Sequence, residues 1–331
     1  MKKKRLAVVA ALATTTALLL TACSGGSTGS DEAAKSSGDG LTKVTVGVLP
    51  IAPSAVVQMG IDEGIFEKNG LEVELQSGQG GTALLPAVSS GSMEFAVGNE
   101  LAVLLAASQG IDMRIVTGFS SNVQNPDDPE DQAPSAVVVK SDSGIESWKD
   151  LEGKTVAVNV FKGLGDLSIM AQVEADGGDP SKINFTEIGF PDQTAQLESG
   201  HIDAAWIPEP FLSGAKATEG IEQLGDPLRI IDNLNTMVTF TSGKFADEHP
   251  DVVKAFAKSI TESADLAMSD TDAFRAAIVD FTGMDAAVVD KVNLEYMSGD
   301  VNREMLEQLN DLAVKYGVIE EAPDLDKVIF K

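Results

Sequence analysis

The sequence contains one cysteine and two histidines among 331 residues. A lone cysteine cannot form a disulfide within the chain, and so few thiol and imidazole groups exclude the usual Cys/His zinc sites. The same scarcity removes the ordinary cysteine–histidine nucleophile pair. We therefore expect no enzyme activity of these kinds, no metal site and no cofactor.

Basic residues are also scarce, since 24 Lys and Arg stand against 51 Asp and Glu, for a formal net charge of −27. A chain this acidic, without a basic stripe, repels polyphosphate, which excludes DNA and RNA as partners. Apolar residues make up 43% and charged residues 23% of the sequence. This composition can bury a substantial core, which excludes wholesale disorder, and the length predicts two globular units.

The apolar stretch at residues 6–20 is shorter than the roughly 20 residues that a membrane-spanning helix needs. It follows the basic residues 2–5, so the start of the chain indicates a secretory signal, with an uncleaved anchor as the alternative. Residues 20–23, LTAC, resemble the lipobox of bacterial lipoproteins, and this resemblance implies a lipid on Cys23. The alternative is a plain signal peptide with a chance cysteine near the cleavage site.

The expected organisation of this start is a signal peptide over residues 1–22 and a lipidated flexible tether over residues 23–40. The tether consists almost entirely of Ser, Gly, Thr, Ala and charged residues, which have little to bury. We expect the protein at the cell surface, anchored by its lipid to the outer face of the cytoplasmic membrane.

An internal repeat is the most informative pattern in the sequence. Residues 90–100 and 199–209 align without a gap at an offset of 109. Both segments have the pattern of a helix that ends at glycine, a short apolar strand, and an acid, Glu100 or Glu209, where the strand ends.

Each copy of the repeat predicts a β-α-β-α-β unit, because short β-branched runs alternate with helical stretches. Such alternation implies sheets with parallel strands and right-handed crossovers, one sheet in each of two lobes. The predicted first and second strands of the two copies are residues 44–49 and 71–76, and residues 155–160 and 183–188.

The rest of the chain completes the two lobes. Further strands are expected at residues 135–140 and 236–241, and helices after residue 251 pack most simply on the first lobe. The expected fold class is α/β, with two mixed, mostly parallel sheets joined by a double-crossover hinge. The predicted boundaries are residues 41–141 with 235–331 for lobe one and residues 142–234 for lobe two.

Three segments carry a family resemblance. Residues 64–73 read GIFEKNGLEV, residues 148–158 read WKDLEGKTVAV, and residues 199–211 read SGHIDAAWIPEPF. They resemble segments of the substrate-binding proteins of importers for nitrate, sulfonate, taurine and thiamine precursors. The resemblance implies a type II periplasmic-binding-protein fold that delivers a small solute to an ABC permease and its ATPase, and the chain is expected to be a monomer.

In open α/β sheets, ligands bind outside the carboxyl ends of the strands, where free backbone N–H groups of helix starts point outward. The loops at these ends are expected at residues 49–54, 77–82, 98–100 and 118–122 of lobe one, and at 159–166, 189–192 and 207–210 of lobe two. The candidate ligand-binding residues in them are Pro53, Ser54, Gln79, Gly80, Thr82, Asn99, Glu100, Ser120, Phe161, Lys162, Gly163, Asp166, Asp192 and Glu209.

The charges of these loops bear on the ligand. The acids are Glu100, Asp166, Asp192 and Glu209, and Lys162 is the single nearby base. Carboxylates beside aromatic rings suit a ligand with amino or ring N–H donors, whereas a sulfonate or nitrate would depend on Lys162 and helix N-termini. Each acid also has an alternative role in capping a helix or its first turn.

Two further features have competing interpretations. Trp206 shares a strand face with apolar neighbours, so a core position is favoured over a ligand platform. The acidic loop at residues 125–131 is interpreted as an exposed loop, with a lid as the alternative.

Two other functions compete with a solute receptor. A sensor lipoprotein would bind the same kind of ligand and report to a signalling partner. An enzyme resembling the thiamine-pyrimidine synthases of this fold would need cysteine and histidine chemistry, for which the sequence offers no cleft residues.

Overall fold

The computed structural model describes residues 40–78, 81–122 and 133–331, with the backbone alone for residues 81–83. The signal peptide, the tether with Cys23, the residues Gln79 and Gly80, and the loop at 125–131 lie outside the described residues, as does the side chain of Thr82. The described residues all belong to one compact unit. None of the helices described in it is both long and apolar enough to cross a membrane.

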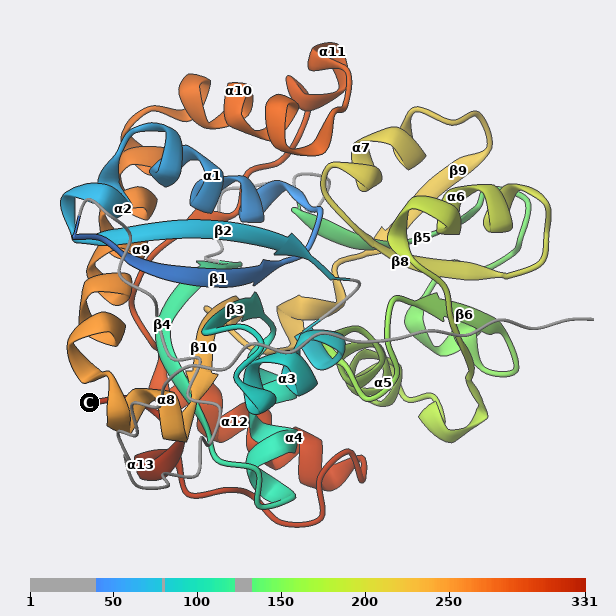
Figure 1. Cartoon of the computed structure of the whole chain (residues 1–331). Helices are drawn as coiled ribbons and strands as arrows, with labels where there is room; N and C mark the ends of the chain where they lie inside the picture. The colour runs from blue at the N-terminus through green and yellow to red at the C-terminus, as the bar shows by residue number, and fades with distance from the viewer. Residues whose placement is uncertain (1–39, 79–80, 123–132) are drawn as a thin grey trace, which may run out of the picture. The chain divides into compact units, whose positions relative to one another are not determined.

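The first sheet has six strands in the order β11-β4-β10-β3-β1-β2 (Figure 1). Strand β1 pairs in parallel with β2 and β3, whereas β10 is antiparallel to both β3 and β4. We call the part of the molecule built on this sheet lobe one. Its strands are β1 (Thr42–Val48), β2 (Leu71–Ser77), β3 (Phe95–Gly98), β4 (Met113–Ser121), β10 (Asn235–Ser242) and β11 (Tyr296–Met297).

The second sheet has five strands in the order β7-β6-β8-β5-β9 and forms the centre of lobe two. Strand β6 is parallel to β7 and β8, whereas β5 is antiparallel to β8 and β9. The strands are β5 (Ser135–Lys140), β6 (Thr155–Val158), β7 (Asn184–Glu187), β8 (Ala204–Pro208) and β9 (Ile221–Gly225).

Helices connect the strands and cover the sheets. In lobe one they are α1 (Ala55–Asp62), α2 (Ile65–Lys68), α3 (Gly81–Ser90), α4 (Glu100–Ser108), α8 (Gly243–Glu248), α9 (Pro250–Ser269), α10 (Thr271–Thr282), α11 (Ala286–Val289), α12 (Arg303–Lys315) and α13 (Leu325–Val328). In lobe two they are α5 (Leu164–Ala175), α6 (Phe190–Glu198) and α7 (Phe211–Lys216).

The predicted repeat is present in both lobes. The units β1-α1-β2-α3-β3 and β6-α5-β7-α6-β8 give the same strand orders, β2-β1-β3 and β7-β6-β8. The turn glycines Gly91 and Gly200 both have left-handed φ angles, of 77° and 72°, which a residue without a Cβ adopts at no steric cost. The fold class predicted from the repeat, two mixed α/β sheets, is thus confirmed.

Two acids at matching positions of the repeat each accept a hydrogen bond from the backbone of a strand. The Thr45 N–H donates to Glu94 over 2.6 Å, and the Thr155 N–H donates to Asp203 over 2.7 Å. In each repeat unit the acid before the third strand therefore holds the backbone of the first strand.

Strand β5 lies in a different lobe from the one expected. The predicted boundary at residue 141 put it in lobe one, but it pairs with β8 and β9 of lobe two. Its run of buried β-branched residues suits a central strand of either sheet, so the sequence pattern did not distinguish the two. Both sheets also hold more antiparallel pairs than expected, because β5 and β10 each run against both of their neighbours.

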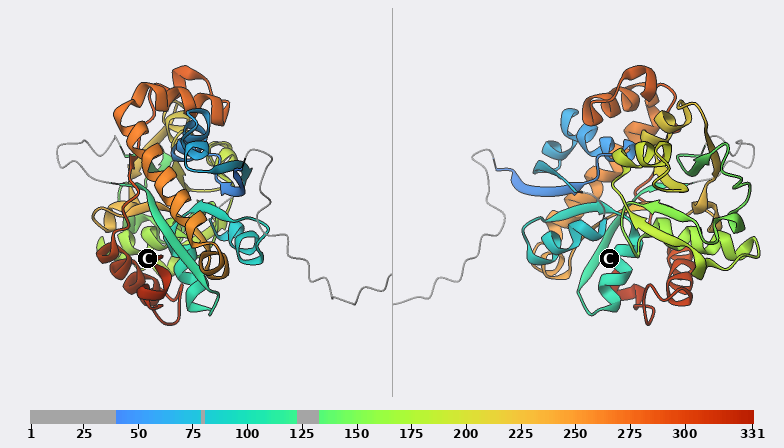
Figure 2. Two further views of the ribbon diagram at one scale, coloured as in Figure 1. Left: turned by 60° about the vertical axis from the view of Figure 1, so that its left-hand side comes forward. Right: turned by 90° about the vertical axis from the view of Figure 1, so that its right-hand side faces the viewer.

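The C-terminal helices pack on lobe one as predicted, and Figure 2 shows α9 and α10 from two further sides. Helix α9 contacts α1, α2 and β4, and Phe256 on it stacks on Phe95 of β3 with ring centroids 3.9 Å apart. A buried aromatic stack of this kind ties the end of the chain to the first sheet.

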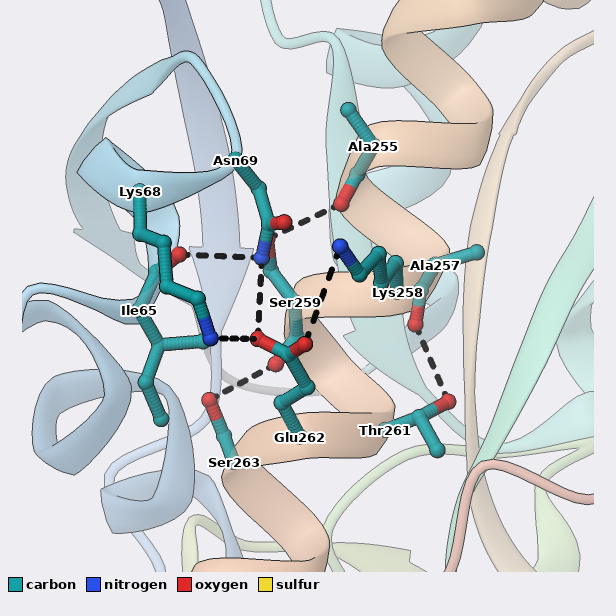
Figure 3. A network of polar contacts seen from close by, with 10 residues as sticks. All are labelled: Ile65, Lys68, Asn69, Ala255, Ala257, Lys258, Ser259, Thr261, Glu262 and Ser263. Atoms are coloured by element: carbon teal, nitrogen blue, oxygen red, sulfur yellow. Dashed lines mark hydrogen bonds and ion pairs between the residues drawn. The ribbon is translucent and has the colours of Figure 1, made fainter.

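The segment at residues 64–73 has a structural role in this packing (Figure 3). The Asn69 amide donates to Ile65 O of its own helix α2, and also to Ser259 Oγ and Glu262 Oε2 of α9, at 3.0–3.1 Å. Lys68 adds an ion pair with Glu262 at 3.6 Å. These contacts hold α2 on α9.

Candidate ligand-binding cleft

A cavity lies between the two lobes, at the carboxyl ends of their parallel strands. It holds about 50 Å³, and about 490 Å³ when the open solvent at its mouth is included. Five of the seven loops expected at these strand ends contribute to its wall, in agreement with the general rule for α/β sheets. The lining residues are Leu49, Ile51, Asn99, Ser135, Asn159, Leu164, Phe190, Trp206, Pro208, Leu228, Thr236, Met237 and Glu295.

Lobe two supplies an aromatic wall. Phe190 and Trp206 meet edge to face, with ring centroids 5.8 Å apart and an interplanar angle of 74°. The Trp206 indole N–H donates to Ser135 Oγ over 3.3 Å. Gly165 of α5 allows this position, because a Cβ there would lie 2.3 Å from the indole.

Trp206 is part of the hydrophobic core, as predicted, and it also lines the cavity. Its side chain is only 8% exposed, as the alternation predicted, but the buried face it occupies is a wall of the cavity. Strand alternation gives the face of a residue and not whether another lobe closes over that face.

Lobe one supplies an acidic wall at Glu295, which precedes β11. The Thr236 hydroxyl donates to Glu295 Oε2, and Ser120 lies 2.6 Å from Thr236, oxygen to oxygen. The residue is half-buried, and burial raises the pKa of its carboxyl, while the hydroxyls of Ser120 and Thr236 oppose the rise.

The charge of Glu295 acts on two more buried acids. Burial raises the pKa of Glu100 to about 8, and the charge of Glu295 adds to the rise. Burial also raises the pKa of Asp226 to about 7; the Leu228 N–H and Arg229 oppose the rise, and Glu295 adds to it. These three carboxyl groups form what we call the acidic cluster, Glu100, Asp226 and Glu295.

The members of the acidic cluster differ in their hydrogen bonds. Asp226 accepts from the Leu228 N–H at 2.9 Å and from the Ser135 hydroxyl at 3.5 Å. Glu100 is fully buried, and neither carboxyl oxygen has a hydrogen-bond partner among the described residues. Its neighbour Asn99 caps α4 by accepting from the Ala102 N–H and lines the cavity.

The Glu209 carboxylate is hydrogen-bonded within the protein. It accepts from the Ser213 N–H at 3.0 Å, the Ser213 hydroxyl at 2.8 Å and the Asn293 N–H of lobe one at 3.2 Å. Burial raises the pKa of Glu209, and these donors oppose the rise. In the structure its carboxylate connects the lobes, and a contact of Glu209 with ligand stays a prediction.

Backbone N–H groups at the start of α5 are also hydrogen-bonded to a nearby side chain. Asp166 is buried and accepts from the N–H groups of Lys162 at 2.7 Å and Leu167 at 3.0 Å, which matches its alternative role at a helix start. Burial raises the pKa of Asp166 to about 6. Phe161 is 47% exposed and Lys162 is exposed, and neither lines the cavity.

The remaining candidates occupy varied places. Pro53 and Ser54 are buried in a short 3-10 helix next to the lining residue Ile51, and Gly163 precedes the lining residue Leu164. Asp192 is exposed in the first turn of α6. Of the predicted side chains, Asn99 lines the cavity directly, and Ser120 and Glu100 lie behind its acidic wall.

Glu295 is the residue that sequence reasoning missed. It lies between helix α11 and the two-residue strand β11, in a segment without a periodic pattern or a repeat partner. Its partners Thr236 and Ser120 are 59 and 175 residues away, so no local signal marked it. No group of three or more potential metal-ligating side chains occurs within the described ranges.

Comparison with known proteins agrees with this architecture. The chain is 26% identical over 227 residues to the taurine-binding periplasmic protein of Escherichia coli, a match that covers 66% of this chain and 65% of that protein. It is 25% identical over 256 residues to a putative aliphatic sulfonates-binding protein of Bacillus subtilis, covering 76% of this chain and 73% of the relative.

A solved structure gives the same fold. The periplasmic aliphatic sulphonate binding protein SsuA of Escherichia coli superimposes with a TM-score of 0.70 at 18% identity, over 87% of this chain and 92% of that one. The family model described as NMT1/THI5 like matches residues 54–273, from the start of α1 to α10. The chain therefore belongs to the NMT1/THI5-like family.

Proposed function

We propose that this protein is an extracytoplasmic solute-binding lipoprotein, which captures a small polar molecule between its lobes and delivers it to an ABC-type permease and its ATPase. The observation that carries the proposal is the cavity, whose wall combines strand ends of lobe one with strand ends of lobe two. A ligand that contacts both walls stabilises the arrangement in which they face each other.

The relatives support a binding role. Both matched proteins are named as binding proteins, for taurine and for aliphatic sulfonates. This likeness supports a binding role over catalysis, and a small molecule of comparable size is the expected ligand. The lobes that would move are residues 41–122 with 235–331, and residues 133–234.

Contacts between the lobes give closure a physical basis. Besides the Glu209–Asn293 hydrogen bond, the Ala52 N–H of lobe one donates to Glu209 O over 3.2 Å. On the far side, Lys315 of α12 pairs with Glu174 of α5 at 2.8 Å. These contacts are lost when the cleft opens, so they favour the closed form together with the contacts that a ligand adds.

Ligand capture is tested with the full chain in detergent. A ligand that binds the native state raises the melting temperature by mass action, and small-angle scattering then measures the radius of gyration. We expect the bound protein to be more compact. A ligand that binds without compaction would contradict capture between the lobes.

Membrane attachment needs its own test. We expect Cys23→Ser to move the protein from the membrane fraction into the soluble fraction, and Ser24→Ala to leave it in the membrane. Retention of the Cys23→Ser chain in the membrane would show that the lipid is not the anchor.

A further inference from the structure

We infer that the cavity takes a small organic ammonium ion, with its N–H groups directed at the carboxylate of Glu295 and its carbon skeleton against Phe190 and Trp206. The inference rests on the proposed function, because it names the class of solute that the same cleft would capture. The inference predicts that the cavity binds amines and does not bind sulfonates or nitrate, because these anions need a cation in the cavity wall.

The charge of the wall is the first argument. Glu295 is the single ionisable side chain among the described residues that line the cavity. The two internal stretches outside the described residues, 79–80 and 123–132, contain no Lys, Arg or His in the sequence. An anion in this cavity would face a carboxylate without a compensating cation, whereas an ammonium ion would form a charge-assisted hydrogen bond.

The donor count is the second argument. Glu100 is fully buried with both carboxyl oxygens unpartnered among the described residues, and its carboxyl is close enough to Glu295 for the two charges to interact. Buried acceptors without donors are rare in folded proteins. A cation held at Glu295 would offset the negative charge that Glu295 presents to this buried carboxyl.

The aromatic wall is the third argument. Phe190 and Trp206 meet edge to face, so the cavity presents ring surface opposite the acid. Ring faces attract cations through their quadrupole and also pack against aliphatic carbon. A small ammonium ion satisfies both walls at once.

Arg229 is the competing anchor. It follows the lining residue Leu228, and its Nε is buried without a hydrogen-bond partner among the described residues. An anion that reached this nitrogen would be held by Arg229. The adjacent Asp226 already offsets that charge, since the two groups act on each other electrostatically.

Trp206 provides the readout. The sequence has two tryptophans, so Trp148→Phe in the full chain leaves Trp206 as the single indole, in the cavity wall. The probes are ethylammonium and benzylammonium against ethanesulfonate, benzenesulfonate and nitrate, with neutral 4-aminopyrimidine as a third class. We expect saturable fluorescence changes with an ammonium ion at pH 7.5.

The matched variants are Glu295→Gln and Glu198→Gln, which make the same change in the cavity wall and on the exposed surface of α6. Loss of the charge-assisted bond should weaken ammonium binding about tenfold or more in Glu295→Gln and leave Glu198→Gln unchanged. Saturable binding of a sulfonate or nitrate that is weakened by Arg229→Gln and not by Glu295→Gln would overturn the inference. So would binding of the neutral ring alone, or no response to either ammonium ion.

The pH dependence of ammonium affinity is a second measurement, which tests the inference even if Glu295→Gln fails to fold. In the unmutated pocket, ammonium affinity should rise from pH 5 to pH 8 as Glu295 ionises, with Glu100 and Asp226 as the neighbouring acids and Arg229 as the neighbouring base. Affinity that falls over this range would overturn the inference. Failure of the proposed function would be seen differently, as ammonium binding without compaction of the lobes.

Discussion

Glu100 and Glu209 stand at the same position of the internal repeat, just beyond the third strand of each repeat unit, and both are buried. Glu209 accepts three hydrogen bonds, two from Ser213 and one from Asn293 of the other lobe. Glu100 has no partner among the described residues. The residue four positions on explains part of the difference, because it is Ser213 in lobe two and the apolar Leu104 in lobe one.

A position that is repeated in the sequence therefore keeps its place in the fold, but the hydrogen bonds of its side chain differ between the two copies. One buried acid is consumed by contacts that hold the lobes together. The other is left with unused acceptors beside the cavity. Three substitutions test this division, and they are described in order of decreasing effect.

Glu100→Gln should change how stability depends on pH. The pKa of Glu100 is raised from 4.5 to about 8, so the folded state binds more protons than the unfolded state between these values. The stability that the protonated carboxyl provides is therefore complete below about pH 4.5 and is lost as the pH rises through 8, by about 5 kcal/mol at most. The glutamine variant should lose much less stability over this range, as measured by urea unfolding at pH 5 and pH 8.

The pKa values of Asp226 and Asp166 are raised to about 7 and about 6, so these groups also make the protein less stable as the pH rises. Some pH dependence of stability should therefore persist in the Glu100→Gln variant. Glu198→Gln, on the exposed surface, serves as the control and should follow the unmutated protein. Equal slopes in Glu100→Gln and Glu198→Gln would mean that the buried carboxyl is already paired.

Glu209→Ala should destabilise the protein at pH 7, because it leaves the buried donors of Ser213 and Asn293 without an acceptor. We expect a loss of about 3 kcal/mol in the free energy of unfolding. Glu198→Ala should cost far less in the same denaturant titration. If the two alanine variants were equally stable, Glu209 would not connect the lobes in solution.

Glu174→Gln probes the exposed contact between the lobes, where Lys315 and Tyr316 both hold Glu174. We expect no measurable change in unfolding, because exposed pairs contribute little, and about a two- to fivefold loss of ligand affinity through a less favoured closed form. Unchanged affinity, measured by the Trp206 fluorescence titration, would mean that this contact does not stabilise the closed form.

The sequence predicted those features that depend on neighbours along the chain. The repeat, the glycine turns at Gly91 and Gly200 and the capping role of Asp166 all follow from local pattern. The lobe of β5 and the role of Glu295 depend on partners far away in the sequence, and several strands or loops would have suited them equally well. Trp206 combines both cases, since alternation gave its burial and the facing lobe made it part of the cleft.

The order of strands also sets the order in which the lobes become complete. The five-stranded sheet uses one continuous stretch, from β5 to β9, whereas in the six-stranded sheet β10 separates β3 from β4. A growing chain that has reached Gly225 thus carries every strand of lobe two, while β3 and β4 still lack the strand that joins them. Because long-range strand pairing is slow to form, we expect lobe one to be completed last, and a truncation before Asn235 removes β10 and β11 while leaving every strand of lobe two.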